Sequence, residues 1–223
     1  MEYDEEIDIE NKIIGINQPC FIIAEIGVNH NGDLILAKKL IDKAVEAGAD
    51  AVKFQKRNLQ SLYRKESLEN PNSESQGFEI LLAELKEVEL TKDDYKKIVD
   101  YCKEKNITFL CTPWDTPSVD FLEEIDTVAY KISSGDTTNF PLIKYVSKTR
   151  KPMIISTGMS KIDEVEKMIS FVRMQNVPFI ILHANSTYPS PIESLNVSLI
   201  SEFEKKFEVP IGFSDHEIGI IGS

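Results

Sequence analysis

Cysteine is scarce in this sequence, and the spacing of the cysteines indicates neither a disulfide framework nor a zinc site. The three cysteines, Cys20, Cys102 and Cys111, are odd in number and far apart, so no C-x-x-C pair exists. Small secreted domains and structural zinc sites depend on closely spaced or paired cysteines. The sequence therefore predicts a protein of a reducing compartment, with the cytoplasm as the expected location.

Long apolar runs and an excess of basic residues are also absent. No uninterrupted apolar stretch is long enough to span a bilayer, and the acidic start, Met1–Glu6, lacks the basic and apolar regions of a signal peptide. The 25 Lys and Arg residues against 37 Asp and Glu residues give a formal net charge of −12. Nucleic acids and anionic membranes require a basic surface, so neither is expected as a partner.

Several motifs that carry chemistry are missing. The sequence contains no H-E-x-x-H, no Walker lysine loop, no G-x-G-x-x-G and no G-x-S-x-G. Nucleotide hydrolysis, dinucleotide binding and serine-hydrolase chemistry therefore have no support. The 223 residues, of which 42% are hydrophobic, nevertheless suffice for one large α/β core.

The sequence does contain a regular alternation of apolar, strand-like runs with amphipathic segments. Residues 7–18 are expected to form a hairpin that turns at Glu10–Lys12. Seven further strands are predicted at 21–26, 51–55, 107–111, 128–132, 152–156, 179–183 and 209–213. Predicted helices are capped by Asp33, Thr91, Ser160 and Asn196, with others at 81–88, 117–124 and 140–148, and a long polar connection is expected at 57–76.

This alternation predicts a parallel sheet, and polar residues follow the C-terminal end of nearly every strand. A doubly wound sheet would draw its site from two or three strands, so the pattern favours a TIM-type (β/α)8 barrel. Such a barrel has eight strands and typically about 250 residues. The expected α/β fold is therefore a barrel truncated after about seven strands at 21–223, preceded by a hairpin cap at 1–20.

Three charged residues interrupt the apolar strands. Glu25 lies in the first strand, Lys53 shares one face of the second strand with Gln55, and Lys131 lies within the fourth. Buried lysines are costly unless an anion meets them, which indicates a phosphate or carboxylate pocket. The alternative for each lysine is an ion pair with Glu25 or another internal acid.

Small hydroxyl residues follow several strands. Thr112, Ser133–Gly135, Ser156–Gly158 and Ser214 can present hydroxyl and backbone donors to phosphate oxygens, although each loop alone is more typical of a turn or a helix cap. His216 is either structural or a metal ligand whose ring Asp215 orients. His183 ends an apolar run and is expected to be a core histidine, whereas His30 remains open.

Taken together, these motifs resemble the sialic acid synthases, including the relatives that make legionaminic-type sugars. The resemblance rests on six segments that occur in order between about residues 20 and 220: Ala24–Gly32, Val52–Gln55, Lys131–Asp136, Ser156–Met159, Tyr188–Pro189 and Gly212–His216. It implies a synthase that condenses phosphoenolpyruvate with an open-chain N-acetylated amino sugar such as N-acetylmannosamine. Phosphate leaves, and a nine-carbon 2-keto acid forms. The resemblance also implies a divalent metal, Mn²⁺ or Mg²⁺, that polarises the sugar aldehyde.

Roles for individual residues follow from the same resemblance. The positions that match phosphoenolpyruvate-binding residues are Lys53, Gln55, Thr112, Lys131, Ser134, Ser156, Ser186 and Ser214. Glu25 and Tyr188 match sugar-binding positions, and Asp136 lies where a carboxylate would help deprotonate the attacking water. Glu25, Lys131 and Asp136 are thus the expected catalytic residues, and His216 matches one of two histidine metal ligands.

The sequence also departs from that family. The second metal histidine would belong to an eighth strand, beyond Ser223, and the C-terminal antifreeze-like domain, which lends an arginine to the partner subunit of a homodimer, would also lie beyond it. The chain is therefore expected to be either a fragment of a longer protein or a barrel that is itself incomplete. The chain alone is therefore expected to be weakly active or inactive and to associate through its open strand. Two alternatives remain open: a non-catalytic truncated barrel that binds phosphoenolpyruvate or a similar anion, and an aldolase that uses Lys131 as a Schiff base.

Overall fold

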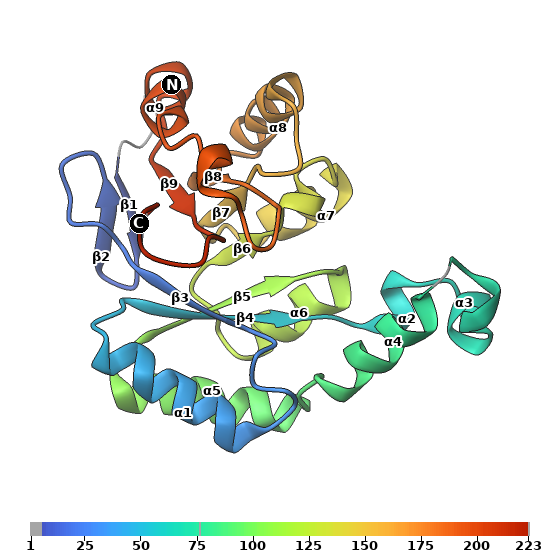
Figure 1. The fold of residues 1–223 in the computed structure, drawn as a ribbon. Helices are drawn as coiled ribbons and strands as arrows, with labels where there is room; N and C mark the ends of the chain where they lie inside the picture. The colour runs from blue at the N-terminus through green and yellow to red at the C-terminus, as the bar shows by residue number, and fades with distance from the viewer. Residues whose placement is uncertain (1–5, 76, 223) are drawn as a thin grey trace. The chain divides into compact units, whose positions relative to one another are not determined.

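The computed structural model of this protein describes residues 6–75 and 77–222. The first five residues of the predicted 1–20 cap, the last residue of the predicted 57–76 connection, and Ser223 lie outside the described residues. The chain divides into two compact units, which we call the central unit, Phe21–Thr127, and the terminal unit, which joins the segment up to Cys20 to the segment from Val128. Figure 1 labels the elements of each unit.

The central unit contains three parallel strands in the order β3 (Ile23–Gly27), β4 (Ala51–Lys56) and β5 (Thr108–Pro113). Among its helices are α1 (Leu34–Glu46), α5 (Lys92–Lys105) and α6 (Thr116–Glu124). Helices α1 and α5 pack against each other, as Figure 1 shows. The strand register places Lys53 opposite Glu25 and Gln55 opposite Thr112, so the predicted site residues lie at one edge of this sheet.

The predicted helix starts in this unit are confirmed where the capping side chain is close in sequence. Asp33 accepts hydrogen bonds from the backbone N–H groups of Ile35 and Leu36, and Thr91 accepts one from that of Asp94. Helix α5 buries the face that its spacing predicted, formed by Tyr95, Ile98, Val99 and Cys102.

The connection from β4 to α5 is more ordered than the predicted polar loop. It forms the short helices α2 (Leu59–Leu62) and α3 (Lys65–Glu69), the 3₁₀ turn η1 (Pro71–Ser73) and the helix α4 (Phe78–Glu87). Elements as short as α2, α3 and η1 produce no readable apolar period, which is why the sequence did not indicate them. Helix α4 is the helix predicted at 81–88, and it begins three residues earlier. In α4, Leu82 is buried but Leu81 is 44% exposed.

The terminal unit begins with the predicted hairpin, formed by β1 (Glu6–Ile9) and β2 (Lys12–Gly15). The two turn residues, Glu10 and Asn11, have φ angles of 55° and 67°. Two successive left-handed residues make the turn whose twist matches antiparallel strands. Ile7 and Ile9 are buried, so one face of the hairpin belongs to the core.

Four parallel strands follow in the order β6 (Tyr130–Ile132), β7 (Met153–Ser156), β8 (Phe179–Ala184) and β9 (Ile211–Ser214). The helices between them are α7 (Phe140–Ser147), α8 (Ile162–Gln175) and α9 (Leu199–Phe207), with 3₁₀ turns η2 (Ser134–Asp136) and η3 (Ile192–Ser194). In the part of the chain that the structure describes, the predicted seven parallel strands and their alternation with helices are therefore present.

Two predicted caps in this unit are wrong. Helix α8 begins after Lys161 rather than Ser160, and the Glu164 carboxylate caps it by accepting from the Lys161 backbone N–H at 2.7 Å. Helix α9 begins after Ser198, because Asn196 adopts a left-handed φ of 48° and lies in the preceding turn. The direction from which the chain enters each helix selects the capping residue, and the tertiary structure sets that direction.

No helix among the described residues combines the length and the apolarity that crossing a bilayer would require.

Candidate functional site

Lys53 is the centre of the predicted site in the central unit. Its ammonium nitrogen lies 2.8 Å from Glu25 Oε2 and donates to Thr112 Oγ1 at 2.9 Å. The lysine side chain is 8% exposed and that of Glu25 is 51% exposed. The alternative that the sequence left open, an ion pair with Glu25, is thus what the structure shows. Because the acid faces solvent, an incoming anion can displace it without leaving a buried carboxylate unpaired.

Gly27 explains how the Glu25 carboxylate and the Gln55 amide come together. The glycine has a φ of 56°, and a Cβ there would lie 3.0 Å from Glu25 Oε1 and 3.4 Å from Gln55 Nε2. A larger residue would push both polar groups away and would be strained in this conformation. Gln55 Oε1 in turn accepts from Arg57 Nη2 at 2.5 Å.

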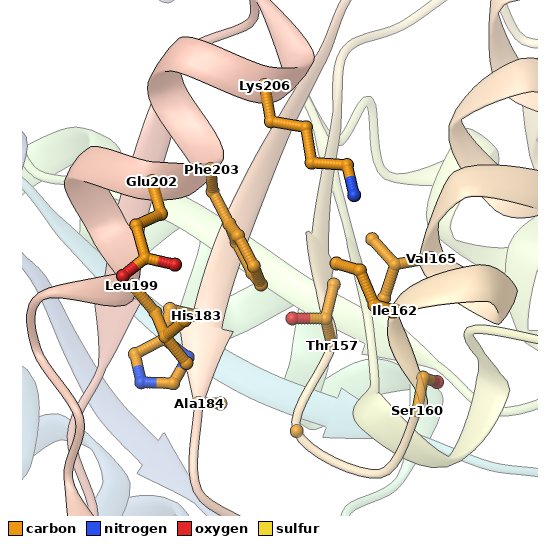
Figure 2. Close-up of a pocket in the computed structure, with 11 residues that line it drawn as sticks. Thr157, Ser160, Ile162, Val165, His183, Ala184, Leu199, Glu202, Phe203 and Lys206 are labelled. Carbon is orange, nitrogen blue, oxygen red and sulfur yellow. The ribbon is translucent and has the colours of Figure 1, made fainter.

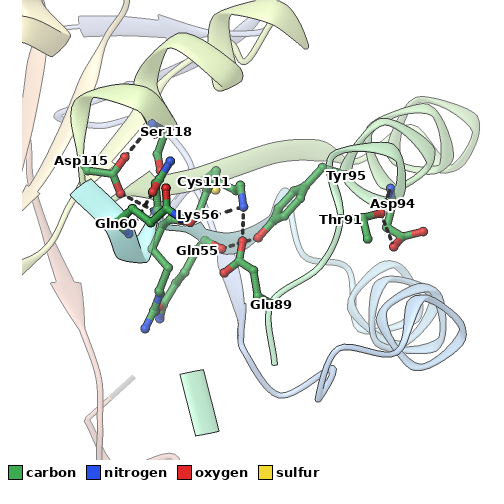
Figure 3. Close-up of polar contacts among 12 residues, drawn as sticks. Gln55, Lys56, Gln60, Glu89, Thr91, Asp94, Tyr95, Cys111, Asp115 and Ser118 are labelled. Atoms are coloured by element: carbon green, nitrogen blue, oxygen red, sulfur yellow. Dashed lines mark hydrogen bonds and ion pairs between the residues drawn. The ribbon is translucent and has the colours of Figure 1, made fainter. Parts of the chain in front are cut away.

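A network of polar contacts fixes the C-terminal end of β4, as Figure 3 shows. Lys56 pairs with Glu89, and the Tyr95 hydroxyl donates to the Gln55 carbonyl oxygen. Burial raises the pKa of Glu89, and the neighbouring Lys56 opposes that shift. Burial also raises the pKa of the Cys111 thiol, so this cysteine does not supply a thiolate at neutral pH.

Lys131 is the buried lysine of the terminal unit, and its contacts correspond to those of Lys53 in the central unit. Its ammonium nitrogen donates to Ser156 Oγ at 2.6 Å and to the Ile132 carbonyl oxygen at 2.9 Å. Lys131 is 7% exposed and Ser156 is 3% exposed. Adjacent parallel strands β6 and β7 supply the two residues. The arrangement repeats the buried lysine and hydroxyl pair of Lys53 and Thr112.

The loops after β6, β7 and β8 meet around Gly158. The Gly158 N–H donates to Ser134 Oγ at 3.1 Å, and a Cβ on the glycine would lie 2.6 Å from Ser186 Oγ. Two of the four predicted hydroxyl-bearing loops therefore lie side by side with the loop that carries Ser186. The Asp136 carboxylate accepts from Ser133 Oγ at 2.8 Å and from Asn139 Nδ2 at 3.0 Å, which fixes its orientation at the start of α7.

His216 is held in one orientation by its neighbours. Its Nδ1 lies 2.5 Å from the Asn185 carbonyl oxygen, and its Nε2 lies 3.1 Å from the Tyr188 hydroxyl and 3.3 Å from Ser214 Oγ. A carbonyl accepts only from a protonated nitrogen, so Nδ1 carries the proton and the lone pair is on Nε2. The predicted orientation by Asp215 is wrong, because Asp215 instead accepts from the Glu217 backbone N–H at 3.2 Å.

This geometry fits a metal ligand, since histidine ligands commonly donate their other N–H to a carbonyl or carboxylate. Across residues 6–75 and 77–222, however, no three His, Cys, Asp or Glu side chains gather closely enough to hold a metal ion. The described residues therefore offer His216 as one ligand and not a complete metal centre.

The other two histidines are structural. His183 Nε2 lies 2.7 Å from the Leu195 carbonyl oxygen, and the ring packs between Phe203 and Phe213, as expected for a core histidine. His30 is 1% exposed, stacks on Phe54, and accepts from the Gly32 N–H at its Nδ1. Burial lowers the pKa of His30.

A cavity of about 410 Å³ in the terminal unit was not indicated by any sequence motif. Figure 2 shows it between α8 and α9, with His183, Phe203 and Lys206 among its lining residues. Gly158 also lines the cavity, and its backbone N–H donates to Ser134 Oγ. The cavity therefore adjoins the loops that carry predicted site residues.

The structure thus brings the predicted residues together within each unit. Glu25, Lys53, Gln55 and Thr112 form one group, and the other group contains Lys131, Ser134, Ser156, Ser186, Tyr188, Ser214 and His216. Sequence reasoning missed Arg57, Asn185 and the close approach at Gly27, whereas Gly158 lies in a predicted loop. The alternation that placed Lys53 and Gln55 on one side also places Arg57 there, and this was the available signal.

Comparison with known proteins identifies the family. The model described as "NeuB family" matches residues 40–223. The chain is 40% identical over 209 residues to N-acetylneuraminate-9-phosphate synthase of Mus musculus and of Homo sapiens, covering 93% of this chain and 58% of each relative. It is 38% identical over 211 residues to N,N'-diacetyllegionaminic acid synthase of Campylobacter jejuni, covering 89% of this chain and 61% of that protein.

A solved structure agrees with these sequence relatives. The N-acetylneuraminic acid (sialic acid) synthetase of Leptospira borgpetersenii, crystallised in complex with citrate, matches with a TM-score of 0.86 and 36% identity, covering 97% of this chain and 72% of that one. The predicted barrel-type fold and the resemblance to sialic acid synthases are therefore confirmed. The chain spans 58% of the length of the first mammalian relatives. With its barrel strands, its buried lysines and these relatives, the chain belongs to the NeuB family.

Proposed function

We propose that the chain carries substrate-binding and catalytic residues of a sialic-acid-type synthase. The reaction condenses phosphoenolpyruvate with an open-chain N-acetylated amino sugar, releases phosphate and forms a nine-carbon 2-keto acid. The observation that carries this proposal is the repeated pairing of a buried lysine with a hydroxyl group at a strand end, Lys53 with Thr112 and Lys131 with Ser156. Buried ammonium groups beside hydroxyl donors are suited to a multiply charged phosphate.

The remaining roles follow from the contacts of each residue. Gln55, Ser134, Ser186 and Ser214 supply further hydrogen-bond donors to phosphoenolpyruvate. Glu25 and Tyr188 bind the sugar, because both are accessible to a ligand. The Glu25 side chain is 51% exposed, and Tyr188 as a whole residue is 72% exposed. Asp136 orients or deprotonates the attacking water, with Ser133 and Asn139 holding its carboxylate in place.

A divalent metal, Mn²⁺ or Mg²⁺, belongs to the proposal. His216 would hold it at one coordination position through Nε2, because the Asn185 carbonyl fixes the proton on Nδ1. When bound, such an ion acts as a Lewis acid on the sugar carbonyl. A homodimer of the full-length protein, acting in the cytoplasm, completes the proposal.

The test is release of inorganic phosphate by the full-length protein. We expect release to require both phosphoenolpyruvate and an N-acetylhexosamine, and Lys131→Met to abolish it. The exposed Lys167→Met variant, which removes only a surface pair with Asp163, is the matched control and should retain full activity. Phosphate release without the sugar would contradict the proposal.

The second candidate is a non-catalytic domain that binds phosphoenolpyruvate or a similar anion. The same lysine and hydroxyl pairs support it, because they can bind an anion without turnover. Titration calorimetry separates the two functions. Binding of phosphoenolpyruvate by the full-length protein, with no product in the presence of any N-acetylated sugar, would favour this second function.

A further inference from the structure

The cavity between α8 and α9 is kept open by direct contacts between these two helices. Lys206 Nζ lies 2.6 Å from Glu166 Oε1, and Arg173 Nη2 donates to the Phe207 carbonyl oxygen at 2.5 Å. Both contacts join α9 to α8 and fix their separation. The cavity volume of about 410 Å³ lies within the range of pockets that bind small molecules. The terminal unit therefore contains a preformed space of ligand size.

The lining of the cavity combines an apolar wall with a few polar groups. Side chains of both helices form the apolar wall, as Figure 2 shows: Ile162, Val165, Leu199 and Phe203. The polar side chains that line it are Thr157, Ser160, His183, Glu202 and Lys206. A lining of this kind suits a molecule with an apolar body and a small number of polar atoms.

The charged groups around the cavity leave one carboxylate without a counterion. The Lys206 ammonium is already neutralised by Glu166. Glu202 lies one turn earlier on α9 and has no cationic partner among the residues that the structure describes. Figure 2 shows its carboxylate on the α9 side of the cavity. The surroundings of the cavity therefore carry a net negative charge, which favours a cation over an anion.

His183 supplies a hydrogen-bond acceptor to the cavity. The residue is 7% exposed, and its Nε2 donates to the Leu195 carbonyl oxygen at 2.7 Å, which leaves the lone pair of the neutral ring on Nδ1. Nδ1 has no hydrogen-bond partner within residues 6–75 and 77–222, and Figure 2 shows a ring nitrogen directed toward the cavity. An acceptor with so little access to solvent favours a ligand that brings an N–H or O–H group.

The cavity adjoins the proposed substrate site but does not share its residues. The Gly158 N–H donates to Ser134 Oγ, and the loop from Thr157 to Ser160 forms part of the cavity wall. None of the lining residues is assigned to phosphoenolpyruvate or to the sugar. An anion and a polyhydroxylated sugar also do not match an apolar wall with an excess of acceptors. The occupant of this cavity is therefore a different molecule from the two substrates.

We propose that the cavity between α8 and α9 is a second binding site, for a small organic cation that has an apolar body and a further N–H or O–H donor. The cationic group pairs with Glu202, and the apolar body lies between Val165 and Phe203. The further donor bonds to His183 Nδ1. The inference goes beyond the proposed function, because it requires neither phosphoenolpyruvate nor the sugar.

Titration calorimetry of the full-length protein with tryptamine tests this site, because tryptamine carries an ammonium group, an apolar ring and an indole N–H. We expect a Kd of about 1 mM or below, as for other ligands of this size. The neutral analogue tryptophol and the N-methylated 1-methyltryptamine should each bind at least about threefold more weakly. Indole-3-acetate, an anion with the same ring, should show no measurable binding.

Protein variants locate the site. Glu202→Gln should weaken tryptamine binding at least about threefold and leave tryptophol binding unchanged, since it removes only the charge. Glu204→Gln removes the same charge from α9 outside the cavity lining and is the matched control. Ile162→Trp, at a position that is 45% exposed, fills the cavity and should abolish tryptamine binding. Saturating phosphoenolpyruvate should not displace tryptamine.

Absence of tryptamine binding, equal binding of any of the three analogues, or unchanged tryptamine binding in Glu202→Gln would overturn the inference. Displacement by phosphoenolpyruvate would assign the cation to the substrate site and would overturn it as well. If Ile162→Trp lacks a cooperative urea unfolding transition, the analogues and the Glu202→Gln comparison decide the outcome. Phosphate release tests the proposed function separately, so the failure of one leaves the other intact.

Discussion

The ammonium nitrogen of Lys53 lies 2.8 Å from a carboxylate oxygen of Glu25, yet one side chain is 8% exposed and the other 51%. The buried lysine is therefore neutralised by an acid that remains in contact with water. Removing one partner of a buried pair is costly, whereas exchanging a solvent-exposed acid for another anion is much less so. This asymmetry makes the pair a suitable place for a phosphate or carboxylate to enter.

Replacing Glu25 should separate substrate binding from turnover. In Glu25→Gln the competing negative charge is gone and the side-chain volume is kept, so we expect phosphoenolpyruvate to bind roughly three- to tenfold more tightly. Turnover should fall, because Glu25 also contacts the sugar in the proposed function. Titration calorimetry and phosphate release measure the two effects, with the exposed Glu69→Gln variant as control. Weaker binding in Glu25→Gln would contradict this reading of the pair.

Lys131 should not form a Schiff base. Its nitrogen serves as a donor to Ser156 Oγ and to the Ile132 carbonyl, whereas a nucleophilic lysine must present a lone pair. We expect borohydride treatment in the presence of pyruvate to leave the mass of the protein unchanged. A reduced adduct at Lys131, located by peptide mass mapping, would instead favour the aldolase alternative.

His216 should be required for metal affinity in the full-length protein. The Asn185 carbonyl fixes the imidazole tautomer, so His216→Gln removes a preoriented nitrogen. After removal of metal with EDTA, we expect Mn²⁺ to bind at least about tenfold more weakly to this variant than to the wild type. Asp163→Asn alters only an exposed pair with Lys167 and should bind Mn²⁺ as the wild type does. Unchanged affinity in His216→Gln would exclude His216 as a ligand.

His30 should make stability depend on pH. Burial lowers the pKa of His30 below the usual 6.5, so the unfolded chain takes up a proton that the folded chain does not. The contribution of His30 to the free energy of unfolding should then be complete above about pH 6.5. The free energy of unfolding should decrease as the pH falls below that value, by at most about 1.4 kcal/mol per pH unit. Protonation would also cost the bond from the Gly32 N–H to Nδ1.

Urea unfolding at pH 7.5 and pH 5.5 measures this dependence. His30→Gln does not titrate, so its free energy of unfolding should decrease less than that of the wild type between the two pH values. Comparing the two proteins cancels the contribution of other titrating groups. The same decrease in both proteins would show that His30 does not cause it.

Local patterns predicted most of the secondary structure. The alternation of strands and helices, the caps at Asp33 and Thr91 and the buried face of α5 depend on neighbours only a few residues away. Predictions failed where the cause was not local. Ser160 and Asn196 have the chemistry of helix caps, but the packing of the chain before each helix moved the start to Lys161 and Ser198.

The candidate site also has features that the sequence predicted and contacts that only the structure shows. Residue type and spacing singled out Lys53, Lys131 and His216, and the family resemblance added their roles. Neither could decide that Asn185, rather than Asp215, holds the His216 ring, or that Arg57 rests on Trp114. Contacts of this kind join residues far apart in the chain, so short-range spacing does not encode them.

The sequence by itself determined the order of strands and helices, the family and the chemical groups available at the strand ends. Hydrophobic periodicity and turn chemistry act over a few residues, so they can be read from the chain. Only the tertiary structure decided that Glu25 neutralises Lys53 and that Gly27 lets Gln55 approach them. Those outcomes depend on strand register and on close approach between segments, which local sequence does not encode.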